Sequence, residues 1–402
     1  MAERIVIVGA GQAGVQAAAS LRAEGFGGSL VLIGEEPFPP YQRPPLSKAY
    51  LAGDFARERL FLKPETFFSE AGCELRLSSK VAAIERAARR VVLEGGETLP
   101  YDKLLLATGA RVRRISAPGA KLDGIHYLRG ISDADALRPR FAPGARLVVV
   151  GGGYIGLEVA AVAAKHGLAV TVIEAASRVM ERAVSPLLSS FYAGEHNRHG
   201  VRLMLNCGAR GFTGNGRVEA VMTDAGNIAA DVVLVGIGIV PNTDLAAAAG
   251  LAVGDGIKVD DCTRTSDPAI FAAGDCTDHP ALAGGRVRLE SVQNAIDQAK
   301  HAALAMLGTP KPYREVPWFW SDQYDLKLQI AGLARPGDTL VARGDPSARK
   351  FAVFHLRSGA LAAVEAVNAA PEYVAGRRLI AEGKTVDAAR LADPTVPMKS
   401  FS

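Results

Sequence analysis

A glycine-rich turn between a buried strand and a helix narrows the choice of fold for this chain. It lies in Ile5–Gly14, IVIVGAGQAG, ahead of the helix-compatible run Val15–Leu21. The first glycine of such a turn permits a tight bend, the second lets the backbone approach a pyrophosphate, and the third allows close helix–strand packing. A second apolar strand, Ser29–Gly34, ends at Glu35, whose carboxylate can accept both ribose hydroxyls. The pattern predicts a dinucleotide-binding βαβ unit, whereas a ligand-free turn would leave Glu35 unexplained.

The same pattern recurs at Gly151–Gly156. A strand is expected at Arg146–Val150, a helix at Leu157–Lys165, and a further strand at Ala169–Ile173 that ends at Glu174. A carboxylate at this position binds a ribose 2′-hydroxyl and repels a 2′-phosphate. The second turn therefore predicts a second dinucleotide site, one that prefers NADH over NADPH.

Composition places the chain among soluble globular proteins. Its 402 residues are 49% apolar and 22% charged, which predicts two or three domains with a large core. The net charge of +4 is too small to imply nucleic acid. Four widely spaced cysteines fit a reducing cytoplasm, and the early first strand leaves no room for a signal peptide. Because Leu147–Ala164 holds three consecutive glycines and Glu158, we expect a strand and a buried helix there, and no membrane span.

The rest of the chain alternates short apolar runs with turn residues. Prolines in Pro37–Lys48 predict a shaped, irregular loop, and Glu74–Ala107 predicts a small antiparallel meander that closes on a buried strand. Beyond about Pro317, short alternating strands and a terminal helix predict a third domain of α+β type. Three further elements are expected, namely a strand within Asp231–Pro241, a strand within Thr265–Cys276 and a helix over Ser291–Leu307.

These features resemble the two-dinucleotide flavoprotein disulfide reductase superfamily. The glycine turns, ATGA at Ala107–Ala110, and the strand before Gly274–Asp275 carry that resemblance. YQRPPLSK at Tyr41–Lys48, ESVQNA at Glu290–Ala295 and PWFWSDQ at Pro317–Gln323 resemble the oxygenase-coupled, NADH-dependent ferredoxin reductases within it. The similarity covers essentially the whole chain.

The resemblance implies an α/β fold with two Rossmann-like domains and a C-terminal α+β domain. The FAD-binding domain would be discontinuous, over residues 1–112 and 243–316, because the NAD-binding domain, 113–242, interrupts it. Residues 317–402 would form a C-terminal interface domain.

The same resemblance implies two sets of contacts with cofactors. The FAD contacts would be Gly9, Gly11, Ala13, Gly14, Glu35, Arg43, Lys48, Val81, Arg129, Asp275 and Val292, with Trp320 beside the isoalloxazine. The NADH contacts would be Gly151, Gly153, Tyr154, Ile155, Gly156, Glu158, Glu174, Arg182, Gly236 and Gly238.

The resemblance implies a catalytic role for three residues, namely Lys48, Glu158 and Trp320. Lys48 would lie close to flavin N5 and pair with Glu158, so that a cation and a carboxylate flank the path of the hydride. The neighbours of Glu158 are all apolar, and an unpaired buried carboxylate is unfavourable. Asp275 would accept a hydrogen bond from a ribityl hydroxyl, and the helix that begins near Val292 would stabilise negative charge on the reduced flavin.

Thiol chemistry at the flavin is not expected. Disulfide reductases of this superfamily carry a redox-active C-x4-C, and its peroxidases carry one cysteine in the loop that here reads Pro44-Pro45-Leu46. The first cysteine of this sequence is Cys73. Cys276 is expected to pack beside the cofactor, and His196 and His199 to occupy a solvated helix face. No metal site is predicted.

The predicted activity is FAD-dependent transfer of a hydride from NADH and of single electrons to an acidic 2Fe-2S ferredoxin. That ferredoxin would dock transiently and feed a haem-thiolate monooxygenase or a Rieske-type dioxygenase. Segment 76–114 carries nine Lys/Arg against five Asp/Glu when the flanking Glu74 is counted, so we expect it to form a basic docking surface with the third domain. Two alternatives remain open. One is a rubredoxin reductase or diaphorase, and the other is an NADH-sensing flavoprotein resembling apoptosis-inducing factor.

Overall fold

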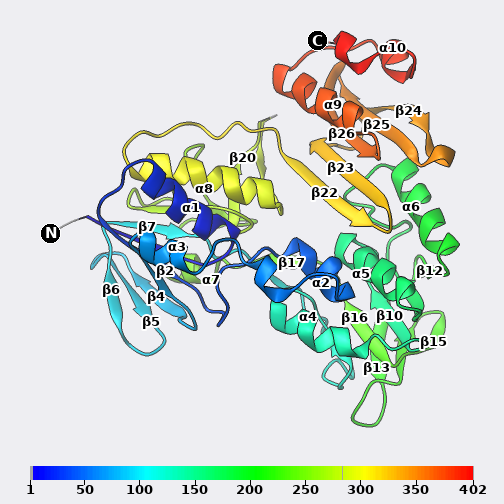
Figure 1. Ribbon diagram of the computed structural model, residues 1–402, viewed down its shortest axis with the longest axis horizontal. Coiled ribbons are helices and arrows are strands. Elements are labelled where there is room, and N and C mark those ends of the chain that lie inside the picture. The colour runs from blue at the N-terminus through cyan, green and yellow to red at the C-terminus, as the bar shows by residue number, and fades with distance from the viewer. Residues whose placement is uncertain (1–2, 283, 402) are drawn as a thin grey trace. The chain divides into compact units, whose positions relative to one another are not determined.

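The computed structural model describes residues 3–282 and 284–401, which divide between two compact units (Figure 1). Each unit is assembled from segments that are distant in the sequence. The first unit comprises Met1–Gln42, Glu58–Arg111 and Val240–Pro317, and the second comprises Arg43–Arg57, Val112–Ile239 and Trp318–Ser402.

A parallel sheet forms the centre of the first unit, with the strand order β19-β7-β1-β2-β3. Helices α1 and α8 lie side by side against one face, as Figure 1 shows, and the meander β4-β5-β6 packs with α7 on the other. Both faces are therefore buried, which explains the continuous apolar runs of the strands. The sheet strands are β1 (Arg4–Val8), β2 (Ser29–Ile33), β3 (Cys73–Arg76), β7 (Lys103–Leu106) and β19 (Ile270–Ala272).

The remaining elements of the first unit are short, apart from its two long helices. The helices are α1 (Gln12–Ala23), α3 (Thr66–Glu70), α7 (Asp244–Ala248) and α8 (Val292–Met306). The strands are β4 (Val81–Glu85), β5 (Arg90–Leu93), β6 (Thr98–Pro100), β18 (Ile257–Lys258), β20 (Thr277–Pro280) and β21 (Arg286–Val287).

The second unit contains another five-stranded parallel sheet, ordered β12-β11-β10-β16-β9. Alternate residues of β10 point to opposite faces, so Leu147 and Val149 pack in one apolar cluster while Val148 and Val150 pack in another. The sheet strands are β9 (Ile125–His126), β10 (Arg146–Val150), β11 (Ala169–Ile173), β12 (Arg202–Met204) and β16 (Val232–Val235). The antiparallel strands beside it are β13 (Ala209–Thr213), β14 (Ala220–Thr223) and β15 (Gly226–Ala229).

The C-terminal part of this unit is an antiparallel sheet, ordered β22-β23-β26-β25-β24, against which α9 packs (Figure 1). Its strands are β22 (Trp318–Gln323), β23 (Leu326–Gly332), β24 (Thr339–Asp345), β25 (Lys350–Arg357) and β26 (Ala360–Val367). The helices of the second unit are α2 (Ala49–Ala52), α4 (Ile131–Leu137), α5 (Tyr154–Lys165), α6 (Pro186–Arg198), α9 (Ala370–Glu382) and α10 (Ala388–Ala392).

Short connecting elements complete the inventory. The 3-10 helices are η1 (Pro44–Ser47), η2 (Arg57–Leu60), η3 (Arg138–Arg140), η4 (Pro346–Ala348) and η5 (Met398–Phe401). Two short strands, β8 (Ala110–Val112) and β17 (Ile239–Pro241), lie where the chain passes from one unit to the other along the sequence.

The predicted α/β fold and most of its elements are confirmed, with three differences. The meander expected over Glu74–Ala107 is smaller, because β3 and β7 join the parallel sheet and only β4, β5 and β6 are antiparallel. The loop Pro37–Lys48 includes the single 3-10 turn η1. Strand β24 was not predicted from the sequence. Within the described ranges, no helix is both long and apolar enough to cross a bilayer.

Candidate functional site

The first glycine turn connects β1 to α1 as predicted. Gly9 has a φ of 114°, and a Cβ added to it would meet the Ala107 carbonyl oxygen at 2.1 Å. A Cβ on Gly14 would lie 2.0 Å from the Gly9 oxygen. Gly11, the N-cap residue, brings no side chain to the helix N-terminus, and a Cβ built on it would meet no described atom within 4 Å. The turn is therefore tight on its protein side and open where a pyrophosphate would bind.

Other predicted FAD contacts gather at the same edge of this sheet. Glu35 follows β2 and its side chain is 71% exposed, and Asp275 follows β19. The N-terminus of α8, at Val292, belongs to the same edge, because a Cβ on Gly274 would lie 3.6 Å from the Ala295 Cβ. Carboxyl ends of parallel strands are where nucleotides bind in such sheets. Val81 begins β4, next to Lys80, whose Nζ is 4.0 Å from a Glu35 oxygen.

Replacing Gly14 by alanine is expected to yield protein that retains little FAD. The added Cβ would overlap the Gly9 carbonyl, so helix and strand must separate and the turn must distort. The ratio of flavin to protein absorbance after purification measures the loss. Gly27→Ala is the control, because a Cβ there would meet no described atom within 4 Å. Equal flavin content in both variants would contradict this account of the cradle.

The second glycine turn repeats this geometry between β10 and α5. Gly151 has a φ of 108°, and a Cβ added to it would lie 2.4 Å from the Gly236 oxygen, whereas one on Gly156 would lie 2.2 Å from the Gly151 oxygen. Gly153 is the N-cap residue of α5 and has open space beside it among the described atoms. Two equivalent cradles therefore stand in one chain.

Glu174 closes the second cradle. It follows β11, and its two carboxylate oxygens accept the backbone N–H groups of Gly152 at 2.6 Å and Ala176 at 2.8 Å. These bonds fix the carboxylate beside the glycine turn, where a ribose would bind. The Arg182 guanidinium lies near Gly238, since a Cβ on that glycine would be 3.9 Å from it. Tyr154 and Ile155, which begin α5, complete this set of predicted NADH contacts.

Lys48 and Glu158 form the ion pair that the sequence resemblance implied. Lys48 Nζ lies 2.7 Å from Glu158 Oε2, and the carboxylate is only 2% exposed. Ser47 Oγ donates to the same oxygen at 2.5 Å, and Ser321 Oγ donates to Oε1 at 2.6 Å. The proline-rich loop thus supplies two of the three partners of a buried carboxylate on α5. Ser47 and Ser321 lie inside the quoted motifs, but no role was predicted for either.

The other predicted residues of the second unit lie in two places. Arg43 donates to the Arg129 carbonyl oxygen at 2.8 Å, which brings these two predicted FAD contacts together. Trp320 lies on β22, and its ring centroid is 5.6 Å from that of Trp318. The contacts of the predicted site residues with FAD and NADH stay predictions.

The prediction for His196 was wrong. It does not face solvent, because its side chain is 0% exposed, and it lies 2.9 Å from Gln323 Oε1 and 3.0 Å from the Tyr324 hydroxyl. Burial lowers the pKa of His196 to about 4. His199 is exposed as expected and stacks on the Tyr324 ring, with a centroid distance of 3.7 Å.

The buried His196 predicts a pH dependence of stability. Its folded pKa of about 4 lies below the usual 6.5, so the unfolded chain binds more protons between these values. The free energy of unfolding should therefore fall by about 3 kcal/mol as the pH drops from 6.5 to 4. Urea midpoints at pH 7 and pH 5 measure the upper part of this fall, about 2 kcal/mol. His279 adds to it in the same direction.

Two histidine variants isolate the contribution of His196. His196→Gln should show a smaller difference between the two urea midpoints, while His199→Gln should keep the full difference. An unchanged pH dependence in His196→Gln would contradict the assignment.

All four cysteines are free thiols. Burial raises the pKa of Cys73 to about 11 and also raises the pKa of Cys276. The Cys276 Sγ lies 3.4 Å from the Ala273 oxygen in the core of the first unit. Neither thiol is thus disposed to ionise near neutral pH.

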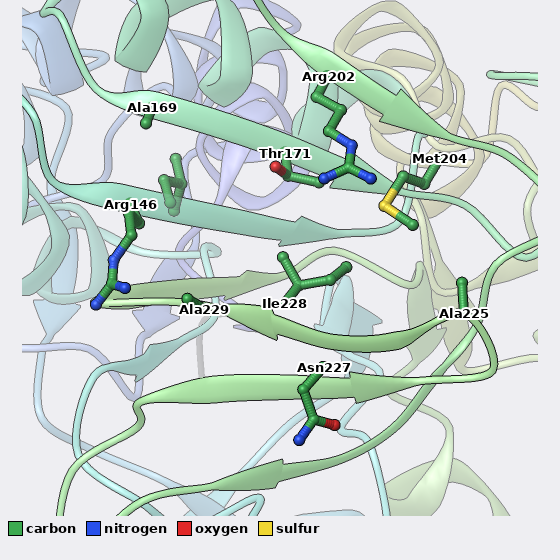
Figure 2. Close-up of a pocket in the computed structure, with 10 residues that line it drawn as sticks. Arg146, Ala169, Thr171, Arg202, Met204, Ala225, Asn227, Ile228 and Ala229 are labelled. Carbon is green, nitrogen blue, oxygen red and sulfur yellow. The ribbon is translucent and has the colours of Figure 1, made fainter.

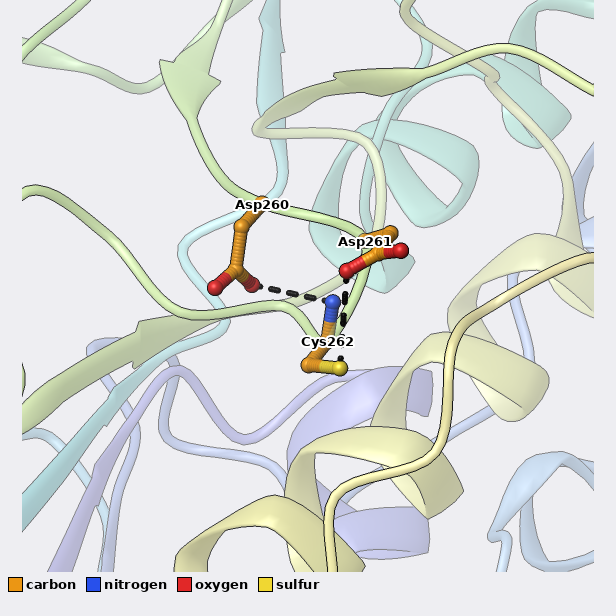
Figure 3. Close-up of side chains that lie close together, drawn as sticks. All are labelled: Asp260, Asp261 and Cys262. Atoms are coloured by element: carbon orange, nitrogen blue, oxygen red, sulfur yellow. Dashed lines mark hydrogen bonds between the residues drawn. The ribbon is translucent and has the colours of Figure 1, made fainter.

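One acidic group has ligand spacing for a metal among residues 3–282 and 284–401, namely Asp260, Asp261 and Cys262 (Figure 3). Asp260 Oδ1 accepts the backbone N–H groups of Cys262 at 2.9 Å and Arg264 at 2.8 Å. The Cys262 thiol lies 3.5 Å from Asp261 Oδ1. These hydrogen bonds stabilise a local turn over residues 260–264, so we assign no metal to this group.

A hollow of about 300 Å³ lies in the second unit, and no residue of the turn Gly151–Gly156 is among those that line it (Figure 2). Thr171, Arg202 and Met204 line it from the parallel sheet, and Asn227 and Ile228 line it from β15. Its other lining residues are Arg146, Leu147, Ala169, Ala225 and Ala229. None of these was predicted to contact a cofactor.

The segment expected to provide a basic surface is largely paired with carboxylates. The pairs are Arg76 with Glu74 and Glu97, Lys80 with Glu94, Arg86 with Asp267, Arg90 with Glu85, and Arg111 with Asp244. Its positive excess is therefore weaker than the residue count suggested.

Comparison with known proteins gives two family matches. Residues 3–299 match the pyridine nucleotide-disulphide oxidoreductase family, and residues 318–402 match the reductase C-terminal family. Rhodocoxin reductase of Rhodococcus erythropolis is 47% identical over 398 residues, which are 98% of this chain and 93% of that protein. The ferredoxin--NAD(+) reductase component of the anthranilate 1,2-dioxygenase system of Burkholderia cepacia is 46% identical over 405 residues, covering 100% and 99%.

A solved structure, the covalent putidaredoxin reductase–putidaredoxin complex, matches with a TM-score of 0.97 and 39% identity. The match covers 99% of this chain and 98% of that one. Two dinucleotide cradles, a cysteine-free loop and these matches lead to one conclusion. The chain belongs to the pyridine nucleotide-disulphide oxidoreductase family, among the reductases that carry the reductase C-terminal domain.

Proposed function

We propose that this chain is an FAD-dependent NADH:ferredoxin reductase that passes single electrons to a 2Fe-2S ferredoxin of an oxygenase system. One observation carries the proposal. The loop in which related peroxidases hold a reactive cysteine here reads Pro44-Pro45-Leu46, and it delivers Ser47 and Lys48 to the buried Glu158. This loop offers the flavin no disulfide or oxidised cysteine to reduce, so the electrons go to an external carrier. The names of the relatives, which include ferredoxin--NAD(+) reductases, support this direction.

FAD and NAD(H) are the cofactors of this family, and the two glycine cradles fit them. Bound FAD supplies the conversion of one hydride into two single electrons. We assign pyrophosphate binding to the turns Gly9–Gly14 and Gly151–Gly156, and ribose binding to Glu35 and Glu174. Lys48 is assigned to orienting the reacting rings, and Glu158 to orienting the Lys48 ammonium.

The three-domain division is part of the proposal. The first parallel sheet receives its last strand, β19, from residues 270–272, after the second sheet has received β16 from residues 232–235. That order supports an FAD-binding domain over 1–112 and 243–316, interrupted by an NAD-binding domain over 113–242. The match at residues 318–402 supports a C-terminal domain over 317–402.

We also propose a cytoplasmic location for the protein. Its four cysteines are free thiols, and three of them are buried. Free thiols are typical of proteins kept in a reducing compartment. Fractionation of the producing cells, with detection of the protein in the soluble cytoplasmic fraction, tests this proposal.

Turnover against a panel of carriers tests the proposed function. The panel contains acidic 2Fe-2S ferredoxins, a rubredoxin and a dye, with NADH as donor. The highest kcat/KM is expected with a ferredoxin. A higher value with rubredoxin would favour a rubredoxin reductase, and a preference for the dye alone would favour a diaphorase.

Two further measurements complete the test. If the acidic ferredoxin docks electrostatically, kcat/KM should fall as ionic strength rises, and insensitivity to salt would exclude steering by charge. A change of mass on addition of NADH, without rapid reduction of any carrier, would instead favour an NADH-sensing flavoprotein.

A further inference from the structure

A row of buried polar side chains leads away from Glu158. Ser321 Oγ donates to Glu158 Oε1 at 2.6 Å, and Gln323 Nε2 donates to Ser321 Oγ at 3.3 Å. Ser321 is 0% exposed and Gln323 is 1% exposed. Both come from β22, where alternate residues share a face of the strand. Ser321 and Gln323, in the second half of the motif PWFWSDQ, therefore have a structural position for which the proposed function gave no role.

The row continues into helix α6. His196 Nε2 lies 2.9 Å from Gln323 Oε1, and the Tyr324 hydroxyl lies 3.0 Å from His196 Nδ1. An amide oxygen can only accept, so we assign the imidazole proton to Nε2 and the acceptor role to Nδ1. Tyr324, His196, Gln323 and Ser321 then donate in turn, each toward the Glu158 carboxylate. Hydrogen bonds aligned in one direction strengthen one another in a medium of low polarity.

The two oxygens of Glu158 are held from different sides. Oε2 faces Ser47 and Lys48, whereas Oε1 faces Ser321 alone among these partners. Removing one partner from a buried charge normally leaves that charge uncompensated and destabilises the protein. The row ending at Ser321 supplies a fixed donor that does not depend on the position of Lys48.

The backbone at Tyr324, the outer end of the row, has a strained conformation that places its side chain against His196. Tyr324 has a φ of 57° and begins the two-residue turn between β22 and β23. Hairpin turns place Gly or Asn at such positions, because a larger side chain is disfavoured there. Here the tyrosine hydroxyl reaches His196 and its ring stacks on His199. A strained conformation of this kind persists where surrounding contacts hold it.

We propose that Ser321, Gln323 and His196 are positioning residues that fix the Glu158 carboxylate, so that Glu158 can aim the Lys48 ammonium during hydride transfer. The proposal rests on the proposed function, since that function assigns Lys48 and Glu158 to the reaction between NADH and FAD. It concerns only the reduction of FAD and needs no ferredoxin.

Stopped-flow reduction of the FAD-loaded enzyme by NADH tests the proposal. Ser321→Ala should lower the limiting rate of flavin reduction about tenfold, the cost of one hydrogen bond to a charged group. The NAD+ dissociation constant of the oxidised enzyme, measured by calorimetry, should not change, because the cradle at Gly151–Gly156 is untouched. Ser321→Thr keeps the hydroxyl and should restore most of the rate. Gln323→Met should lower the rate by less than Ser321→Ala.

Ser189→Ala is the matched control. Ser189 is also a buried serine with a short hydrogen bond, 2.5 Å to the Val179 oxygen, but it lies outside the row. Its replacement should leave the limiting rate unchanged. A normal rate in Ser321→Ala, or an equal loss in Ser189→Ala, would overturn the proposal. If Ser321→Ala does not fold, Gln323→Met and Ser321→Thr decide the question.

A second readout is independent of activity. Nitrogen-15 NMR of the labelled histidines, with His196 assigned from the His196→Gln variant, should show a neutral ring protonated at Nε2. Protonation at Nδ1 would overturn the direction of the row. The two proposals fail separately. If the wild type reduces its flavin normally, Ser321→Ala slows that step, and no ferredoxin accepts electrons, only the proposed function is contradicted. If the enzyme turns over with a ferredoxin but Ser321→Ala leaves the rate of flavin reduction unchanged, only this inference is contradicted.

Discussion

Replacement of Lys48 by methionine is expected to lower the limiting rate of FAD reduction by NADH by about a hundredfold or more. Methionine keeps the length of the side chain but removes the cation that pairs with Glu158 at 2.7 Å. The carboxylate would keep its bonds to Ser47 and Ser321, so the variant should still fold and bind FAD. Stopped-flow absorbance of the flavin measures the rate, and saturation with NADH separates it from binding.

Lys165→Met is the control for this effect. Lys165 is exposed at the last turn of α5, the helix that also carries Glu158, and its replacement should leave the rate unchanged. A rate for Lys48→Met within about twofold of the wild type would show that the ion pair has no part in hydride transfer. Such a result would leave Lys48 with a purely structural role.

The ratio of kcat/KM for NADH to that for NADPH is expected to fall about a hundredfold in Glu174→Gln. Glutamine can still accept the Gly152 N–H through its one oxygen, although it gives up the bond to the Ala176 N–H, and the negative charge is lost. Removal of the charge weakens the bond to a ribose hydroxyl and ends the repulsion of a 2′-phosphate, and each effect contributes roughly tenfold. Steady-state kinetics with both coenzymes and one ferredoxin measure the ratio.

Glu35→Gln is the matched variant in the other cradle. Glu35 follows β2 with one residue between them and Glu174 follows β11 directly, so each carboxylate lies at the carboxyl edge of a parallel sheet. Glu35→Gln should weaken retention of FAD and leave the preference for NADH intact. A change of preference in Glu35→Gln, or none in Glu174→Gln, would reverse the assignment of the two cradles.

Local patterns account for the parts of the fold that the sequence predicted. The close approaches at Gly9 and Gly151 arise within a few residues of chain, so the glycine spacing reports them. Glu35 and Glu174 could be placed because a residue that follows a parallel strand lies at the carboxyl edge of the sheet. Asp275 could be placed only through the family resemblance, since β19 joins β7 across more than 160 positions of sequence.

Long-range hydrogen bonds account for what the sequence did not predict. Ser321 reaches Glu158 over 163 positions, and His196 reaches Gln323 over 127. A histidine pair at i and i+3 gives no sign of which member is buried, because burial depends on a strand from another part of the chain. The edge strand β3 was misplaced for a similar reason, since its partner β2 lies some forty positions earlier.

Strand β22 limits how this protein can be redesigned. Its two tryptophans, Trp318 and Trp320, alternate with Phe319, Ser321 and Gln323, and only Tyr324 and Asp325 separate it from β23. Because side chains alternate along a strand, inserting or deleting one residue in that turn would exchange the two faces. The buried row and the aromatic face would then be lost together. Chimeras that exchange C-terminal domains should therefore keep this hairpin at its present length and cut the chain elsewhere.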